Sequence, residues 1–199
     1  MTPILNDYQK WTDSTAIYRQ NIDQMHWLNY CILGLNEEAG ELLKVKSDMT
    51  LRQVPKGLFD SSLSPELNIA SIMERAENFL KEAGDVMWYI SQLANLLGVR
   101  LSDCLDRFKE EVIEGWVDKE DLLKVVFLAG QIAGYQKKSL RDKTDFRDKF
   151  ILAIGGIIHR LYAIVGSNDT SFELVLQTNM EKLSSRKDRG VLQGSGDNR

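Results

Sequence analysis

The sequence has little cysteine and no concentrated positive charge, and each scarcity excludes a class of protein. Cys31 and Cys104 are the two cysteines among 199 residues, and they form no Cys-x-x-Cys pair. They therefore provide neither a disulfide framework nor a cysteine zinc site, and we expect both to be reduced core residues. The formal net charge is −4, and no long basic run occurs before the C-terminal tail, so we expect no nucleic-acid partner.

Long apolar runs are also missing. The N-terminus, MTPILNDYQKWTDST, is polar from its first residues and does not resemble a signal peptide. The most apolar stretch, FILAIGGIIHRLYAIVG, is short for a membrane span and is interrupted by His159 and Arg160. We therefore expect a soluble cytoplasmic protein that has no membrane partner.

Proline is scarce too, and its placement favours helix. The three prolines are Pro3, Pro55 and Pro65, so no proline after residue 65 interrupts a helix. Apolar residues recur three and four positions apart almost throughout, while capping residues and glycines divide the pattern into segments. The fold class predicted is all-α. The expected helices lie at about 6–19, 24–49, 67–97, 102 to 112 or 116, 122–140, 146–165, and 170 or 171 to 187, with a loop at 50–66 and a non-helical glycine-rich tail.

A faint internal repeat relates the two parts of the chain. EEAGELLK matches QIAGYQKK at its Ala-Gly pair, and EAGDVMWYISQLANLLG matches FILAIGGIIHRLYAIVG in spacing up to a final glycine. We expect two degenerate helical repeats, residues 1–115 and 116–199, which fold together as one compact unit. The second copy keeps the helices and loses the acids of the first. Glu37, Glu38, Glu41, Glu82 and Asp85 correspond to Gln131, Ile132, Tyr135, Phe150 and Ala153.

Acidic residues stand beside the apolar stripe in two of the expected helices. Glu37, Glu38 and Glu41 lie in EEAGE, while Glu82 and Asp85 lie in EAGD. Residues three and four apart share a helix face, so antiparallel packing of the two helices would bring two acidic pairs together. Partly buried carboxylates need protons or cations to neutralise them. Without histidine or thiolate ligands, such a group favours Mg²⁺ or Mn²⁺ over Zn²⁺.

A simpler interpretation is that these acids form solvated helix faces, paired with lysines such as Lys44. The neighbouring residues favour a site instead. Ala39 and Gly40 in one helix match Ala83 and Gly84 in the other, and a glycine inside a helix costs on the order of 1 kcal/mol relative to alanine. Small residues at both places predict a close approach of the two backbones, which a solvated face does not need.

These motifs resemble the MazG-like, all-α nucleoside triphosphate pyrophosphohydrolases, whose signature is E-E-x-x-E followed by E-x-x-D. LNDYQKWTDSTAIY, LNYCILGLNEEAGEL, GDVMWYISQLANLLGV and the tail NMEKLSSRKDRGVLQGSGDNR are also similar to that family. The resemblance covers residues 1–110 and 170–199 well, and 115–168 poorly. It implies hydrolysis of a nucleoside triphosphate, more readily a deoxy one, between its α- and β-phosphates to give a monophosphate and pyrophosphate. It also implies a helical bundle of that type and a homodimer.

The resemblance further implies residue roles. Mg²⁺, with Mn²⁺ as a substitute, would be held by Glu38, Glu41, Glu82 and Asp85. Glu37, together with Glu38, would act on the attacking water. The residues expected to bind the substrate are Lys44, Trp88, His26, Asn179, Lys182, Arg186 and Arg189, followed by the glycine loop at 194–196. One repeat would thus hold the metals, and the other would supply the basic groups that bind phosphate.

Other functions are less consistent with the residues or stay open. A carboxylate di-iron bundle requires Glu-x-x-His twice, and the nearest sequence here is Asp23-x-x-His26. A non-catalytic helical interaction module suits residues 115–168, which lack the acids, but not the first half. Hydrolysis of a modified or alarmone nucleotide remains an alternative, because it would use the same metal and phosphate groups.

Overall fold

The computed structural model describes residues 2–51, 65–111, 122–167 and 170–192, which form seven α-helices and no strand. The all-α prediction is confirmed. The α-helices are α1 (Thr2–Thr12), α2 (Gln24–Leu51), α3 (Pro65–Leu97), α4 (Leu101–Glu111), α5 (Leu122–Asp142), α6 (Arg147–Gly166) and α7 (Phe172–Asp188). Two short 3₁₀-helices, η1 (Asp13–Thr15) and η2 (Ile17–Gln20), connect α1 to α2.

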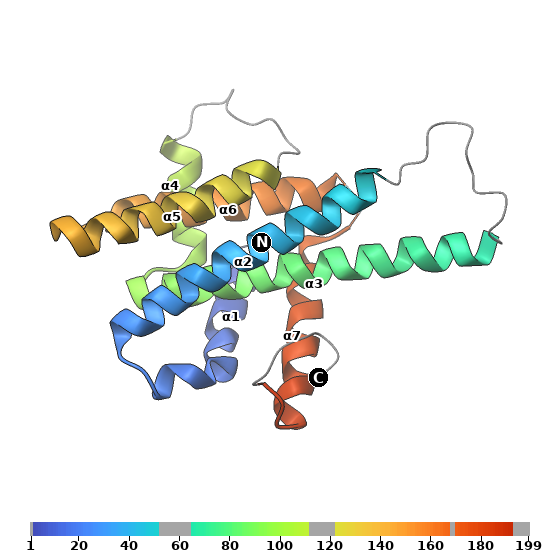
Figure 1. The fold of residues 1–199 in the computed structure, drawn as a ribbon, viewed down its shortest axis with the longest axis horizontal. Helices are drawn as coiled ribbons and strands as arrows, with labels where there is room; N and C mark the ends of the chain where they lie inside the picture. Colours follow the sequence, from blue (N-terminus) through green and yellow to red (C-terminus); the bar gives the residue numbers. More distant parts are fainter. Residues whose placement is uncertain (1, 52–64, 112–121, 168–169, 193–199) are drawn as a thin grey trace.

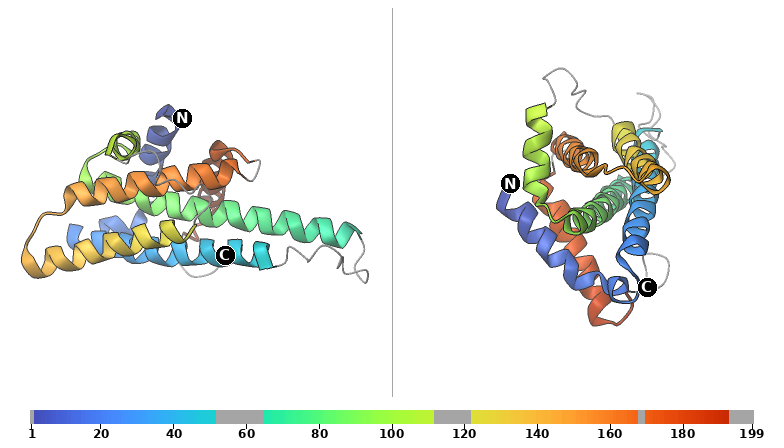
Figure 2. Two further views of the ribbon diagram at one scale, coloured as in Figure 1. Left: turned by 90° about the horizontal axis from the view of Figure 1, so that it is seen from above. Right: turned by 90° about the vertical axis from the view of Figure 1, so that its left-hand side faces the viewer.

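Four long helices form the centre of the molecule. α2 runs antiparallel to α3, α5 runs antiparallel to α6, and α2 also packs against α5 (Figure 1). The right-hand view of Figure 2 looks along these helices and shows the four grouped around one core, with α1, α4 and α7 outside them. α2 and α5 lie on the same side, so their outer surfaces form one face of the molecule.

The core is a single cluster to which both expected repeats contribute. Leu35, Leu42 and Ile90 from the first half pack in the same cluster as Ile132 and Ile157 from the second. The short helix α4 of the first half packs across α6 of the second half. In turn, α7 of the second half packs across α3 of the first. Each half therefore depends on the other to cover a long helix.

The first helix begins and ends earlier than the sequence pattern predicts. α1 starts at Thr2 and stops at Thr12, whereas a start at Asn6 and an end near Arg19 are expected. The reason is that Asn6 does not cap its own helix. Its side chain accepts a hydrogen bond from the Ser102 N–H at 3.3 Å, and Gln9 Oε1 accepts from the Leu101 N–H at 2.8 Å. Two α1 side chains thus satisfy the first N–H groups of α4.

The other helix ends follow the expected signals closely. Gly98 takes a positive φ of 63° immediately after α3, as a glycine that ends a helix commonly does. Ser171 caps α7, because its Oγ accepts a hydrogen bond from the Leu174 N–H at 3.1 Å. Gly166, in contrast, remains within α6 and has no positive φ. The expected loop at 50–66 falls mostly on residues 52–64, and the glycine loop on 194–196, both outside the described residues.

Helix α6 is the most apolar of the described helices. It is long and apolar enough to cross a membrane by length and composition, and no other helix in the described ranges meets that test. However, 67% of its most apolar window is buried inside the bundle, and its buried residues include Ile154, Ile157 and Leu161. The apolar sequence of α6 is therefore accounted for by its central place in the core.

Candidate functional site

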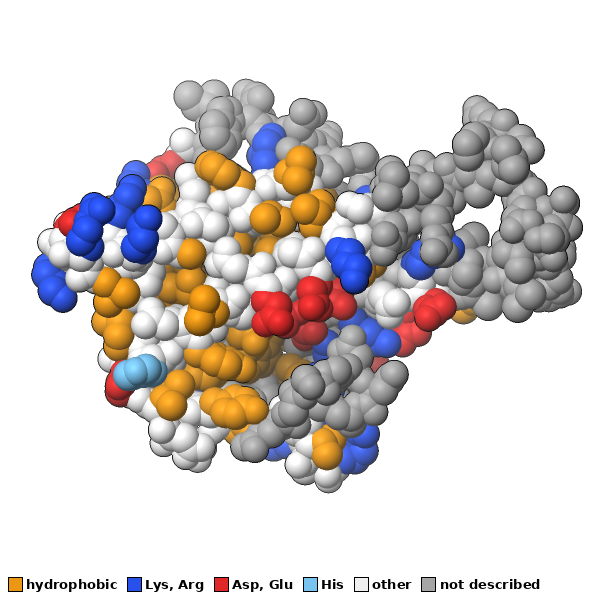
Figure 3. Space-filling view, in the orientation of Figure 1, with side chains coloured by type: hydrophobic (Ala, Val, Ile, Leu, Met, Phe, Trp, Pro, Cys, Tyr) orange, Lys and Arg blue, Asp and Glu red, His pale blue; other side chains and the backbone are white. Residues whose placement is uncertain are grey.

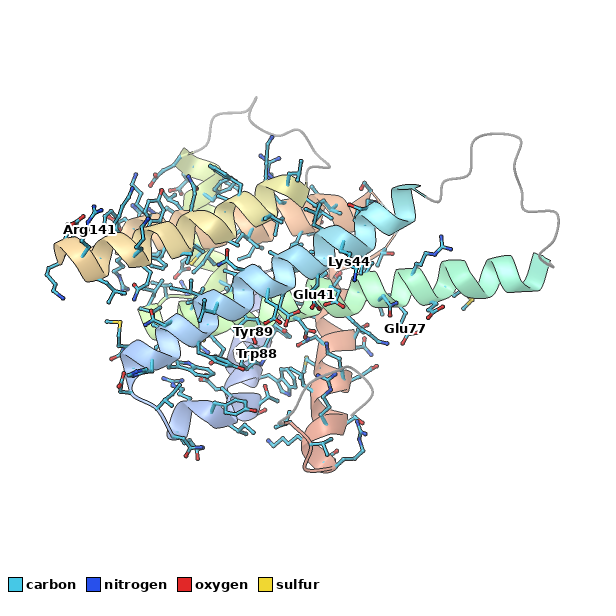
Figure 4. The ribbon with its side chains drawn as sticks, viewed as in Figure 1. Glu41, Lys44, Glu77, Trp88, Tyr89 and Arg141 are labelled. Carbon is cyan, nitrogen blue, oxygen red and sulfur yellow. The ribbon has the colours of Figure 1, made fainter. Side chains whose placement is uncertain are left out.

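Carboxylates from α2 and α3 converge where the two helices pack together. One oxygen each from Glu38, Glu82 and Asp85 lies within 4.8 Å of the others. Glu82 and Asp85 are three residues apart and so share one face of α3. Antiparallel packing of α2 and α3 brings that face toward Glu38, as the sequence pattern predicts. Glu37 and Glu41 lie on the exposed side of α2. Figure 4 shows Glu41 at the edge of α2 that faces α3, and its charge acts on Glu38.

The electrostatics of this carboxylate group centre on Glu38. Burial, together with the negative charges of Asp85, Glu82 and Glu41, raises the pKa of Glu38 from its ordinary value of 4.5 to about 9. Glu38 is therefore protonated at neutral pH in the metal-free protein. Glu82 is only 9% exposed, so both helices hold an acid that water reaches poorly. Such an arrangement favours a bound proton or cation.

Helix α7 brings a cation and an amide to the opposite side of Asp85. Lys182 Nζ forms an ion pair with Asp85 Oδ2, and Asn179 Nδ2 donates a hydrogen bond to Asp85 Oδ1 at 2.7 Å. The Tyr8 hydroxyl from α1 donates to Asn179 Oδ1 at 2.7 Å. Because Tyr8 occupies the amide oxygen, the Asn179 –NH₂ group is directed to the carboxylate.

The sequence analysis expects Asn179 to bind the substrate. Asn179 does lie at this site, and its observed contact is with Asp85. No sequence pattern indicated Tyr8. Its hydroxyl reaches Asn179 across 171 positions of the chain, and both residues are almost fully buried. Tyr8 reaches Asn179 because α1 packs against α3, the helix that α7 also crosses.

The expectation about the mid-helix glycines is only half correct. A Cβ added to Gly84 would lie 2.6 Å from Asn179 Cβ, so Gly84 does permit a close approach, but between α3 and α7. Gly40 has no described atom within 4 Å of such a Cβ and is exposed. The close approach between α2 and α3 occurs instead at Gly34, where an added Cβ would meet the ring of Tyr89 at 2.2 Å. The prediction for Gly40 is wrong because that residue faces away from α3.

An aromatic pocket adjoins the carboxylates. It has a volume of about 110 Å³, and Glu38 and Asp85 form one part of its wall. Trp88 holds its place by donating a hydrogen bond from Nε1 to Thr15 Oγ1 at 2.8 Å, and it meets Tyr89 edge to face (Figure 4). The remaining lining residues are Tyr18, Tyr30, Leu183, Arg186 and Leu192.

The sequence indicated Trp88 and Arg186 among these lining residues, but it did not indicate Tyr18 or Tyr30. Tyr30 precedes Glu38 by eight residues on α2, so the two share a face, and this spacing is a signal that could have identified it. Tyr18 lies in the 3₁₀-helix η2, where α-helical periodicity gives no guidance. The pocket is thus assembled from α2, α3, α7 and the connection between α1 and α2.

Three expected substrate-binding residues are not brought to this group by any contact in the described part of the chain. His26 is exposed at the start of α2, pairs with Asp23 at 2.6 Å, and lies three turns from Glu38. Arg189 is exposed and donates to the Ser185 carbonyl at 3.3 Å. Lys44 is exposed and lies one turn beyond Glu41 on the same edge of α2 (Figure 4). Their roles stay predictions, and Lys44 has the most favourable position of the three.

The second half of the chain has apolar packing at the corresponding crossing. A Cβ added to Gly155 of α6 would meet Phe108 Cβ at 2.8 Å, which parallels the approach of Asn179 to Gly84. Matching these two crossings shifts the expected α3–α6 alignment by three residues, so that Asp85 corresponds to Gly156. Neither alignment places an acid there. Under either alignment, α6 therefore has no acid at the position where α3 has Asp85.

Comparison with known proteins finds a partial relative. The chain is similar to the Gene 37 protein of Mycobacterium phage L5, with 43% identity over 76 residues. The match covers 36% of this chain and 67% of the phage protein. No family model matches the chain, and no solved structure matches it. The resemblance to the MazG-like enzymes thus has no family match behind it and stays a prediction.

Proposed function

We propose that this chain, which belongs to the same family as the Gene 37 protein of Mycobacterium phage L5, hydrolyses a nucleoside triphosphate to a monophosphate and pyrophosphate with Mg²⁺. The name of that relative states no activity, so the proposal is based on the site itself. Its main support is the convergence of Glu38, Glu82 and Asp85 beside an aromatic pocket and the basic residues of α7.

The carboxylate group fits a hard divalent cation. Its three members offer oxygen ligands. The raised pKa of Glu38 means that a proton neutralises the Glu38 carboxylate, and a bound cation could take the place of that proton. Mg²⁺ bound here would polarise phosphate oxygens and acidify a bound water. Lys182 occupies one oxygen of Asp85 in the metal-free protein and could contact the triphosphate once a cation replaces it at that carboxylate.

The pocket and the basic groups suggest how the substrate would lie. A volume of about 110 Å³ is well below the roughly 300 Å³ at which whole-ligand pockets begin, so the pocket has room for one flat ring rather than a nucleotide. Tyr30 and Trp88 provide aromatic faces for such a ring. Because Glu38 and Asp85 lie in the pocket wall, a base held there would direct its phosphates toward the metal ligands.

The experiment is to measure pyrophosphate and orthophosphate release from canonical and modified ribo- and deoxyribonucleoside triphosphates with Mg²⁺, with Mn²⁺ and with EDTA. We expect metal-dependent pyrophosphate release that falls about 100-fold or more in Glu82→Gln, because loss of a group that merely supports a metal ligand already costs about 10- to 100-fold. Glu77→Gln is the matched control, because Glu77 lies on the same helix, is 62% exposed and pairs with Lys81. It should retain full activity.

Two results would contradict the proposal. Release of orthophosphate alone would move the cleaved bond away from the α- and β-phosphates. Equal loss of activity in the Glu77 and Glu82 variants would mean that the buried carboxylates have no special role. Turnover restricted to a modified nucleotide would support the metal site and select the alternative substrate class.

A further inference from the structure

A second cavity lies where α2 begins and α3 ends. Its volume is about 400 Å³, and its lining residues are Arg19, Ile22, Gln24, Trp27, Asn95 and Leu96. Along α2, Trp27 precedes Glu38 by about 16 Å. Along α3, Asn95 follows Asp85 by about 15 Å. Figure 3 shows acidic side chains gathered near the middle of the molecule, away from the lower left, where α2 begins. The second cavity is therefore separate from the carboxylate group.

The size and walls of the second cavity suit a small organic molecule. Pockets of roughly 300 to 1,000 Å³ hold drug-sized ligands. A cavity of about 150 Å³ holds one benzene ring, so a volume of about 400 Å³ has room for two or three rings. Ile22 and Leu96 contribute apolar surface, and Trp27, which is 1% exposed, contributes the buried edge of its ring system. These surfaces favour a ligand with a flat, apolar body.

Arg19 gives the second cavity a positive charge, and it is the one charged residue among the described residues that line it. Its Nη1 pairs with Asp13 Oδ1 at 3.2 Å. That contact uses one of the five N–H donors of a guanidinium, so Arg19 can bind a second anion. The nearby acids are already engaged: Asp13 Oδ1 also accepts from Asn95 Nδ2 at 2.9 Å, and Asp23 pairs with His26 at 2.6 Å. The cavity therefore favours an anionic ligand.

The indole of Trp27 has a hydrogen-bond donor that the fold does not satisfy. Its Nε1 is buried and has no acceptor among the described residues. Buried polar groups in native proteins are nearly always hydrogen-bonded, so this donor indicates a missing acceptor. An oxygen of an anionic ligand, held in the cavity that Trp27 lines, would provide that acceptor.

Trp27 also contacts the aromatic pocket of the candidate site. Its ring stacks on Tyr30 with centroids 5.2 Å apart, and it meets Trp88 edge to face at 6.2 Å. Tyr30 and Trp88 both line the aromatic pocket beside the carboxylates. A closely packed ring moves only if its neighbours move, so a ligand that displaces Trp27 also displaces these two rings.

We propose that the second cavity binds a small aromatic anion and that the bound molecule acts on the aromatic pocket through Trp27. The anionic group lies on Arg19, and the rings lie against Ile22 and Leu96. Binding at the second cavity does not depend on the enzymatic activity proposed above. Its role as an effector site rests on that activity: by linkage, ligands in the two places change each other's affinity by the same factor.

The first measurement is a fluorescence titration of the full chain in EDTA with anilinonaphthalene sulfonate, an aromatic anion that fluoresces when it leaves water. We expect its dissociation constant to rise about tenfold in Arg19→Gln, because a hydrogen bond to a charged group is lost. The exposed Arg19 pair adds little stability, so the fold should persist. Arg141→Gln is the matched control, because Arg141 is exposed and pairs with Asp142 at the end of α5 (Figure 4). Phenylnaphthylamine, which lacks the sulfonate, should bind the wild type and Arg19→Gln equally.

The second measurement locates the probe by the NMR signals of the indole N–H groups, assigned from Trp27→Phe and Trp88→Phe. The anionic probe should shift the signal of Trp27 and, through the ring contact, that of Trp88. The signal of Trp11, which stacks on Tyr8, should stay unchanged.

Four results would overturn the proposal. They are an equal dissociation constant in Arg19→Gln and the wild type, an unshifted Trp27 signal, a Trp27 shift without a Trp88 shift, and loss of binding in Phe127→Ser. The last would place the probe on the exposed apolar surface of α5, where Phe127 is 56% exposed. Absence of pyrophosphate release would contradict the proposed function instead, and it would not change either measurement.

Discussion

Replacing Glu38 with glutamine should make the metal-free protein more stable at neutral pH. The carboxyl of Glu38 has a pKa of about 9 in the folded chain and 4.5 as its ordinary value. At pH 7 the unfolded chain carries it ionised, and folding must bind a proton. Glutamine is already neutral and has nearly the same shape, so Glu38→Gln removes this cost. Glu38 would thus lower the free energy of unfolding until a cation binds at the site.

The size of the gain follows from the two pKa values. The interval from 4.5 to pH 7 is about 2.5 units, which at about 1.36 kcal/mol per unit gives roughly 3.4 kcal/mol. Glu38 keeps some contact with solvent, which screens part of this, so we expect a gain of about 1–2 kcal/mol. The sign fixes the pH dependence. Below pH 4.5 the carboxyl is protonated in both states and the advantage of glutamine vanishes. The advantage grows from pH 4.5 to about 9.

The assay is urea unfolding of both proteins in EDTA at pH 4.5, 7 and 8.5, followed by circular dichroism. Adding Mg²⁺ at pH 7 should reverse the order, because a ligand that binds the folded wild type stabilises it. Glu37→Gln serves as a control, because Glu37 is exposed one position away and should shift stability by less than about 0.5 kcal/mol. A Glu38→Gln variant that is less stable than the wild type at pH 7 without metal would refute the reasoning.

The remaining predictions concern packing and hydrogen bonding around the site. Gly84→Ala should cost about 1–3 kcal/mol in urea unfolding, because its Cβ would lie 2.6 Å from that of Asn179; an unchanged midpoint would contradict this contact. Tyr8→Phe should keep the fold but lower kcat about tenfold with little change in KM, because Asn179 is then free to flip; a change in KM alone would place Tyr8 in substrate binding. Burial raises the pKa of the Cys31 and Cys104 thiols to about 12, so neither should react with a thiol reagent at pH 8 until the chain unfolds, and rapid native labelling would exclude their burial.

The helices and the direction of the acids could be read from the sequence because both depend on local spacing. α2 begins at Gln24 and α3 ends at Leu97 as expected, and the spacing of Glu82 and Asp85 places both on the side that meets Glu38. The early end of α1 could not be read in this way. Its Asn6 looked like a cap for its own helix, but it binds the start of α4, 96 positions away.

The sequence by itself therefore determined the fold class, most helix limits and the acids that share a helix face, because hydrogen bonding and side-chain direction within a helix repeat every few residues. Only the tertiary structure decided which groups meet. It placed Lys182 against Asp85, Tyr8 against Asn179, and Gly84 rather than Gly40 at a close crossing. Such contacts depend on how helices cross, and crossing is set by packing throughout the shared core rather than by the residues next in the chain.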